Sequence, residues 1–130
     1  MSDVTSEKVG AAFRRGVETD DLDAALAVIS PDVVFHSPVV HKPYEGIEAL
    51  RVILTAVNQV FEDFRYTAEF SSPDGHVLKF ACRVGDRELE GVDMLHIGAD
   101  GKVDDFTVMV RPYSAATELR SRMAALLAGS

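Results

Sequence analysis

Residues 64–110 read FRYTAEFSSPDGHVLKFACRVGDRELEGVDMLHIGADGKVDDFTVMV. Apolar and polar residues alternate here in four runs, at 64–70, 78–84, 89–97 and 106–110, which short turn-forming segments separate. An alternation with a period of two is typical of strands with one buried face, and short turns join antiparallel neighbours. This stretch therefore predicts a meander of four antiparallel strands.

The segments around the meander predict helices and one more strand. Apolar residues recur at every third or fourth position in four segments: 9–17, 22–29, 47–61 and 119–127. This spacing places apolar side chains along one face of a helix. The run 33–35 is β-branched and aromatic and predicts a short strand ended by Pro38, and 43–46 predicts a turn. Helices followed by a meander indicate an α+β fold, with the N-terminal helices packed on one face of a curved, mostly antiparallel sheet and an extra C-terminal helix.

Composition excludes several classes of protein. The 130 residues suit a single domain spanning 1–130. The net charge of -8 provides little material for a basic, nucleic-acid-binding face. One cysteine, Cys82, can form neither an internal disulfide nor a multi-cysteine metal cluster. No signal peptide or membrane-spanning apolar run is visible, so we expect a cytoplasmic protein with no membrane partner, no metal and no other cofactor.

Four short landmarks occur in order along the chain: DDLDAAL at 20–26, FHSP at 35–38, YEG at 44–46, and GVDML at 91–95 followed by DGKV at 100–103. With them, residues 8–111 resemble the SnoaL-like branch of the nuclear transport factor 2-like superfamily. The resemblance implies a cone-shaped fold with an apolar pocket for a small hydrophobic ligand, and a homodimer formed through the outer sheet face. Members include ketosteroid isomerases, polyketide cyclases, limonene epoxide hydrolases and non-catalytic domains, so the fold alone leaves the function open.

Asp93 is the strongest candidate for a catalytic residue. Its strand face otherwise carries Leu89, Gly91, Leu95 and Ile97, so its carboxyl lies on an apolar surface. Burial disfavours the ionised form and raises the pKa of such a group unless a partner stabilises the charge. A neutral Asp93 donates a hydrogen bond or a proton, and an ionised one accepts a proton. A purely structural Asp93, bonded to a backbone N–H or a tyrosine hydroxyl, is the alternative.

The resemblance also lets the catalytic positions of two groups of enzymes be compared with this chain. Ketosteroid isomerases use an Asp base, a Tyr donor and a second Asp as oxyanion donor. At the matching positions this chain has Ser37, Phe13 and Asp93, so one of the three roles survives, which argues against steroid isomerisation by that mechanism. The Asp–Arg–Asp set of the epoxide hydrolases is also broken, because Gly91 and Val108 stand at its second and third positions.

The four histidines are weaker candidates for catalytic residues than Asp93. His36 and His96 alternate away from the pocket face, so we expect exposed positions on the sheet or at an interface. His41 falls in a loop at the pocket mouth, and His76 falls in a turn, where we expect it to be solvated. Asp104 shares a predicted face with Phe106 and is a weaker candidate for the pocket rim.

The predicted pocket surrounds Asp93 with ten residues: Phe13, Val17, Phe35, Ser37, Val57, Phe61, Tyr66, Phe80, Phe106 and Val108. Ser37 is a hydrogen-bond donor to ligand at most, and the Tyr66 hydroxyl needs a partner, either Asp93 or a ligand. Two functions remain open. One is a cofactor-independent isomerase, cyclase or hydrolase with Asp93 as acid or base. The other is a non-catalytic small-molecule binding or dimerisation domain.

Overall fold

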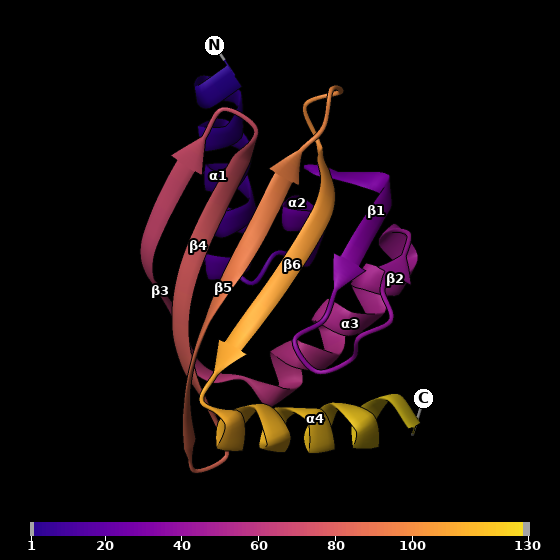
Figure 1. The fold of residues 1–130 in the computed structure, drawn as a ribbon, viewed down its shortest axis with the longest axis vertical. Helices are drawn as coiled ribbons and strands as arrows, with labels where there is room; N and C mark the ends of the chain where they lie inside the picture. Colours follow the sequence, from indigo (N-terminus) through magenta and orange to yellow (C-terminus); the bar gives the residue numbers. More distant parts are fainter. Residues whose placement is uncertain (1, 129–130) are drawn as a thin grey trace.

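The computed structural model describes residues 2–128, which form four helices and one six-stranded sheet (Figure 1). The helices are α1 (Ser2–Glu18), α2 (Leu22–Leu26), α3 (Ile47–Val60) and α4 (Tyr113–Ala128). The strands are β1 (Ile29–His36), β2 (Tyr44–Glu45), β3 (Glu62–Ser72), β4 (Gly75–Val84), β5 (Arg87–Ile97) and β6 (Val103–Arg111). The predicted α+β fold class, with N-terminal helices and an added C-terminal helix, is confirmed.

The sheet has the strand order β2-β1-β6-β5-β4-β3. Strands β3 to β6 pair antiparallel with their neighbours in the chain, which confirms the predicted meander. Strand β1 pairs parallel with β6, so the first strand closes the sheet beside the last one. The two-residue strand β2, predicted as part of a turn, pairs antiparallel with β1.

The second helix is shorter than predicted. It ends at Leu26, and Ile29 lies in β1, paired with Val103. The residue before a proline is disfavoured in the helical region, so Pro31 forces Ser30 towards an extended conformation. At the other end, the Asp21 side chain caps α2 by accepting a hydrogen bond from the Ala24 N–H at 3.1 Å.

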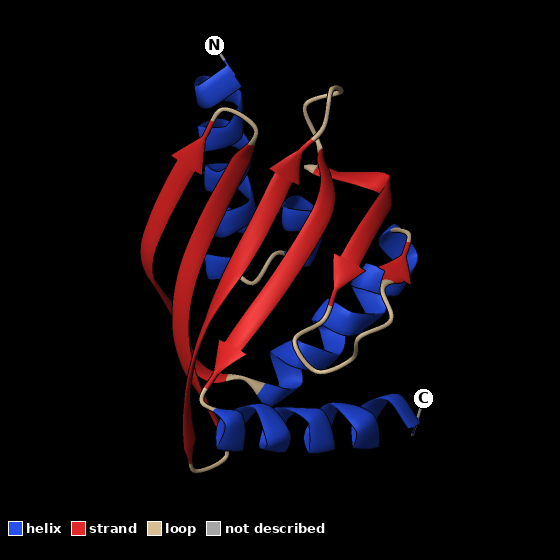
Figure 2. Cartoon of the chain, viewed as in Figure 1, coloured by secondary structure: helices blue, strands red, loops and turns tan. Residues whose placement is uncertain are grey.

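The helices cover one face of the sheet, and α4 crosses its end (Figure 2). Inward side chains of the meander, such as Leu78, Phe80 and Phe106, are fully buried beneath the helices. On the opposite face, Phe70 and Met109 are exposed. The sheet thus has an inner, covered face and an outer, open face. No helix among the described residues is long and apolar enough to span a membrane.

Candidate active site

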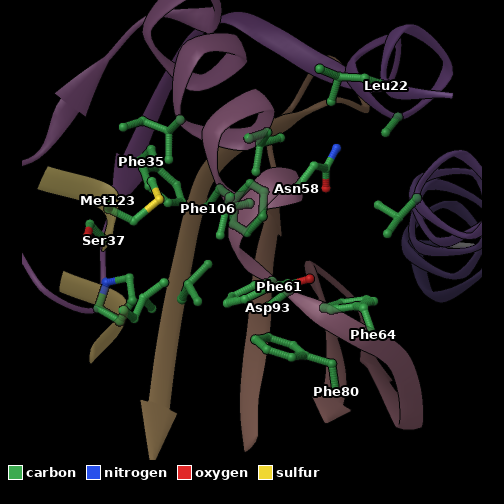
Figure 3. Close-up of a pocket in the computed structure, with 18 of the residues that line it drawn as sticks. Leu22, Phe35, Ser37, Asn58, Phe61, Phe64, Phe80, Asp93, Phe106 and Met123 are labelled. Carbon is green, nitrogen blue, oxygen red and sulfur yellow. The ribbon is translucent and has the colours of Figure 1, made fainter. Parts of the chain in front are cut away.

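A cavity of about 720 Å³ lies between the inner face of the sheet and the helices (Figure 3). Its wall is mostly apolar, with contributions from α1, α2, α3, α4 and the strands. Asp93 lines it, as do the ten residues predicted around Asp93: Phe13, Val17, Phe35, Ser37, Val57, Phe61, Tyr66, Phe80, Phe106 and Val108. The period-two alternation aims the strand residues of this set inward, and the apolar stripes of α1 and α3 present Phe13, Val17 and Val57 to the same cavity.

Strand β5 carries Asp93 into the cavity between two apolar cross-strand neighbours, Leu78 on β4 and Val108 on β6. Two residues earlier, Gly91 has no side chain. A Cβ there would lie 2.4 Å from the Phe80 ring and 2.7 Å from the Met109 carbonyl oxygen. Gly91 therefore lets the Phe80 ring pack directly on the backbone beside Asp93.

The Asp93 carboxyl has one hydrogen-bond partner among the described residues. The Tyr66 hydroxyl donates to Asp93 Oδ2 at 3.2 Å, and no other partner occurs in the described part of the chain. Asp93 is 7% exposed. Burial raises its pKa to about 7, and the Tyr66 hydrogen bond offsets only part of that rise. The ionised and neutral forms therefore both occur near neutral pH, which suits a group that exchanges protons.

Tyr66 is held by aromatic packing. Its ring meets Phe64 edge-on at a centroid distance of 5.0 Å, and Phe64 stacks on Phe80 at 5.0 Å. Burial, followed by the Asp93 charge and hydrogen bond, raises the pKa of Tyr66 well above its usual value. Tyr66 thus stays protonated and acts as a donor to Asp93.

A family model described as the SnoaL-like domain matches residues 10–106. The chain belongs to the SnoaL-like family. This confirms the resemblance inferred from the four sequence landmarks.

Solved structures of similar proteins include a steroid δ-isomerase from Pseudomonas aeruginosa, 39% identical, with a TM-score of 0.89 over 96% of this chain and 93% of that one. An uncharacterised protein with a cystatin-like fold from Silicibacter pomeroyi is 32% identical, with a TM-score of 0.84 over 90% and 83% of the two chains. SalBIII, an epoxide hydrolase/cyclase-like enzyme of pyran ring formation in salinomycin, is 16% identical, with a TM-score of 0.70 over 88% and 97%. This last likeness concerns the fold alone. A comparison with curated proteins finds no match.

One wall of the cavity in this SnoaL-like chain comes from α4, whose apolar stripe left open whether it covers the pocket or a partner subunit. Helix α4 contributes Leu119, Met123 and Leu127, and the loop after β1 adds Val39 and Val40. The apolar stripe at 119–127 indicated a buried face, but periodicity does not say what covers it. Asn58 on α3 also lines the cavity, although it does not belong to the apolar stripe predicted over 47–61.

Two predicted positions are wrong. His76 was expected in solvent but is only 4% exposed, because α1 covers this end of the β3–β4 hairpin. Asp104 was expected at the pocket rim but bonds to His96 Nδ1 at 2.6 Å and does not line the cavity. The register shift between His96 and Ile97 interrupts the alternation at this point, which moves Asp104 off the face of Phe106.

His36 and His96 point away from the cavity, as the alternation predicted. His36 bonds Asp105 at 3.0 Å away from the cavity, and His96 faces Asp104 and Asp74. His41 is exposed in the loop that supplies Val39 and Val40 to the cavity wall. Among the described residues, no group of three His, Cys, Asp or Glu could hold a metal ion.

Proposed function

We propose that this SnoaL-like chain binds a small, largely apolar molecule that carries a carbonyl oxygen, and that Asp93 acts on this oxygen as a general acid. The observation that carries the proposal is one buried carboxyl, partnered by Tyr66, inside an apolar cavity of about 720 Å³. An enclosed apolar wall with one or two placed polar groups is the usual form of a small-molecule site.

In its neutral form, Asp93 donates its proton towards the ligand oxygen while the Tyr66 hydroxyl stays bonded to Oδ2. Full transfer moves the proton from the carboxyl to the carbonyl oxygen and leaves a carboxylate, which Tyr66 stabilises. The same carboxylate can then take a proton from a neighbouring carbon or hydroxyl of the ligand. Such steps underlie isomerisation and cyclisation without a cofactor.

The Pseudomonas relative bears the name of a steroid δ-isomerase, which makes a β,γ-unsaturated 3-ketosteroid a natural first substrate to assay. Ser37, at the position where the family resemblance implies a base, carries no carboxylate. We therefore expect the ketosteroid to bind with little isomerisation, and the Ser37→Asp variant to isomerise it faster.

The direct test compares Asp93→Asn with Asp93→Leu. The Asn variant keeps a hydrogen-bond donor of the same size but cannot exchange a proton, whereas the Leu variant loses both properties. Native mass spectrometry and extraction first identify any ligand that the purified protein carries, and that compound and the ketosteroid then serve as probes. We expect the Asn variant to bind like the wild type and to lose turnover about a hundredfold or more, the low end of what acid–base catalysis contributes. Turnover that survives in the Asn variant would contradict the proposal.

The pH profile separates the two roles of Asp93. A general acid must be protonated, so activity should fall as pH rises through about 7, the pKa of Asp93 in the ligand-free protein. Activity that instead rises through this range would assign the base role.

The second candidate is a binding or dimerisation domain without catalysis, and Ser37 and Phe13 at the two altered family positions favour it. This candidate predicts binding of the same probes by the wild type with no turnover at any pH.

We further propose a homodimer through the outer sheet face. A row of side chains crosses the outer face of the meander in register, from Phe70 through Val77 and Met94 to Thr107. Phe70 is 65% exposed, and Met109, two residues after Thr107 on β6, is 56% exposed. Exposed apolar side chains on one face of a sheet favour an interaction surface there.

A further inference from the structure

Arg14 on α1 lies over the ring of Tyr66, with its guanidinium carbon 5.5 Å from the ring centroid. Two carboxylates hold this guanidinium. Glu18, one turn later on the same helix, accepts from Nε at 3.0 Å, and Glu69 on β3 accepts from Nη1 at 2.5 Å. The arginine is thus fixed between its own helix and the strand that carries Tyr66.

Glu69 is itself fixed by a buried histidine. Its second oxygen, Oε2, lies 2.8 Å from His76 Nε2, and Ser71 Oγ lies 2.5 Å from His76 Nδ1. A neutral imidazole satisfies both contacts when Nε2–H donates to Glu69 and Nδ1 accepts from the Ser71 hydroxyl. Burial alone would raise the pKa of Glu69, but the hydrogen bonds from His76 and Arg14 outweigh it and lower that pKa. Glu69 is therefore a fixed negative charge at neutral pH.

Helix α1 can approach His76 this closely because residue 10 is glycine. A Cβ at Gly10 would lie 2.1 Å from His76 Cδ2, far inside contact distance. The helix backbone therefore covers the imidazole directly, which keeps His76 4% exposed and orients it towards Glu69.

We propose that Arg14 is a positioning residue for Asp93: the chain of contacts from His76 through Glu69 to Arg14 holds the guanidinium against Tyr66 and thereby directs the Tyr66 hydroxyl onto the Asp93 carboxyl. An effect of Arg14 on catalysis rests on the proposed function of Asp93, but the contacts that hold Arg14 against Tyr66 do not.

The electrostatic consequence has a definite sign. A cation on the ring face stabilises electron density on the phenol oxygen, and the Arg14 charge accordingly lowers the pKa of Tyr66 against the larger effects of burial and Asp93. A more acidic hydroxyl is a stronger donor to the Asp93 carboxylate, and this hydrogen bond lowers the pKa of Asp93. Removal of Arg14 should therefore raise the pKa of Asp93 further.

Few other charged residues face Tyr66 and Asp93. Glu18 on α1 acts on Tyr66 in the opposite direction to Arg14. The remaining charged residues of the cavity lining are Asp20 and Asp21 at the start of α2, Arg65 on β3 and Arg120 on α4, all of them exposed to solvent. Helix α3 contributes only uncharged groups to the cavity lining within the described residues, Asn58 among them.

Arg122 on α4 offers a matched control. It forms the same i, i+4 pair with Glu118, at 2.9 Å from Nε, but it lies over no aromatic ring in the described part of the chain. An Arg14 that only stabilised its helix would behave like Arg122.

The experiment measures the Asp93 carboxyl titration by ¹³C NMR in the ligand-free full chain. We expect the Asp93 midpoint to rise by roughly half a pH unit or more in Arg14→Met, to rise less in Arg14→Lys, which keeps the charge, and to stay unchanged in Arg122→Met. Glu69→Gln removes the anchor while keeping its size, and should also raise the midpoint.

An Asp93 midpoint that is the same in the wild type, Arg14→Met and Glu69→Gln would overturn the positioning role, whatever the ligand assays show. Amide NMR spectra of each variant verify the fold, and Glu69→Gln keeps the test decisive if Arg14→Met does not fold. A shifted midpoint together with an Asp93→Asn variant that retains turnover would support the positioning contacts and reject the proposed function separately.

Discussion

Two aspartates on neighbouring strands show how much the two faces of this sheet differ. Asp93 on β5 points inward, is 7% exposed and hydrogen-bonds to Tyr66. Asp105 on β6 points outward, where its carboxylate lies 3.0 Å from His36 Nε2 and its side chain is 44% exposed. The residue type is the same, so the face of the sheet decides whether the carboxyl is buried or exposed.

The physical reason is solvation. Water stabilises the Asp105 carboxylate and screens its pair with the half-exposed His36. Asp93 is only 7% exposed, and its one hydrogen-bond partner in the described contacts is the uncharged Tyr66 hydroxyl, so burial raises its pKa to about 7. One face of the sheet therefore suits proton transfer and the other suits contact with solvent or a partner.

The largest effect should come from Asp93→Asn, measured as stability against pH. The folded-state pKa is about 7 against 3.8 for the ordinary group, so between these values the folded wild type keeps a proton that the unfolded chain releases. The free energy of unfolding of the wild type should therefore fall as pH rises from 4 to 7, by up to about 4 kcal/mol relative to Asp93→Asn. Urea unfolding of both proteins at pH 4 and pH 8 measures this. If the wild type and Asp93→Asn differ in free energy of unfolding by the same amount at both pH values, burial does not raise the pKa of Asp93 and the contrast with the outer face is lost.

An intermediate effect should come from Met109→Asp on the outer face. A charge on the proposed apolar interface should weaken the dimer at least tenfold, or about 1.4 kcal/mol. Val52→Asp is the control, because Val52 is similarly exposed, at 53% against 56%, but lies on α3. Sedimentation analysis over a range of concentrations gives the result, and a wild type that stays monomeric throughout would reject the dimer.

The smallest effect should come from Asp105→Asn. The His36–Asp105 pair is about two-fifths exposed, so solvent screens it and its loss should change the free energy of unfolding by less than about 1 kcal/mol. Urea unfolding at pH 6 tests this. A loss above about 2 kcal/mol in the free energy of unfolding would mean that solvent does not screen the His36–Asp105 pair.

The inner-face residues were predictable because strand alternation is a local property. Leu89, Asp93 and Leu95 must point to the same side whatever surrounds the strand, and the same rule placed Tyr66 and Phe80 on the inner face. The rule failed at Asp104 and at Phe70, which the alternation of 64–70 places on the face of Tyr66, because register shifts interrupt the alternation at both points. A shift of this kind depends on the partner strand, which local periodicity does not describe.

Contacts between distant segments were not predictable. His76 looked like a turn residue until α1 placed Gly10 directly over it. The sequence around Arg14 does not predict its contacts with Glu69 and Tyr66, which lie more than fifty residues away along the chain. Helix α4 showed an apolar stripe, but its place at the end of the cavity follows from packing against the sheet and α3.

The sequence by itself determined the helices, the meander, the SnoaL-like family and the inward direction of Asp93, because periodicity and short motifs are local. The tertiary structure alone decided that Tyr66 donates to Asp93, that α4 helps to line the cavity, and that His76 and Glu69 anchor Arg14. These features depend on which surfaces meet when distant segments bury their apolar faces together, and burial then sets the pKa of the carboxyl at their centre.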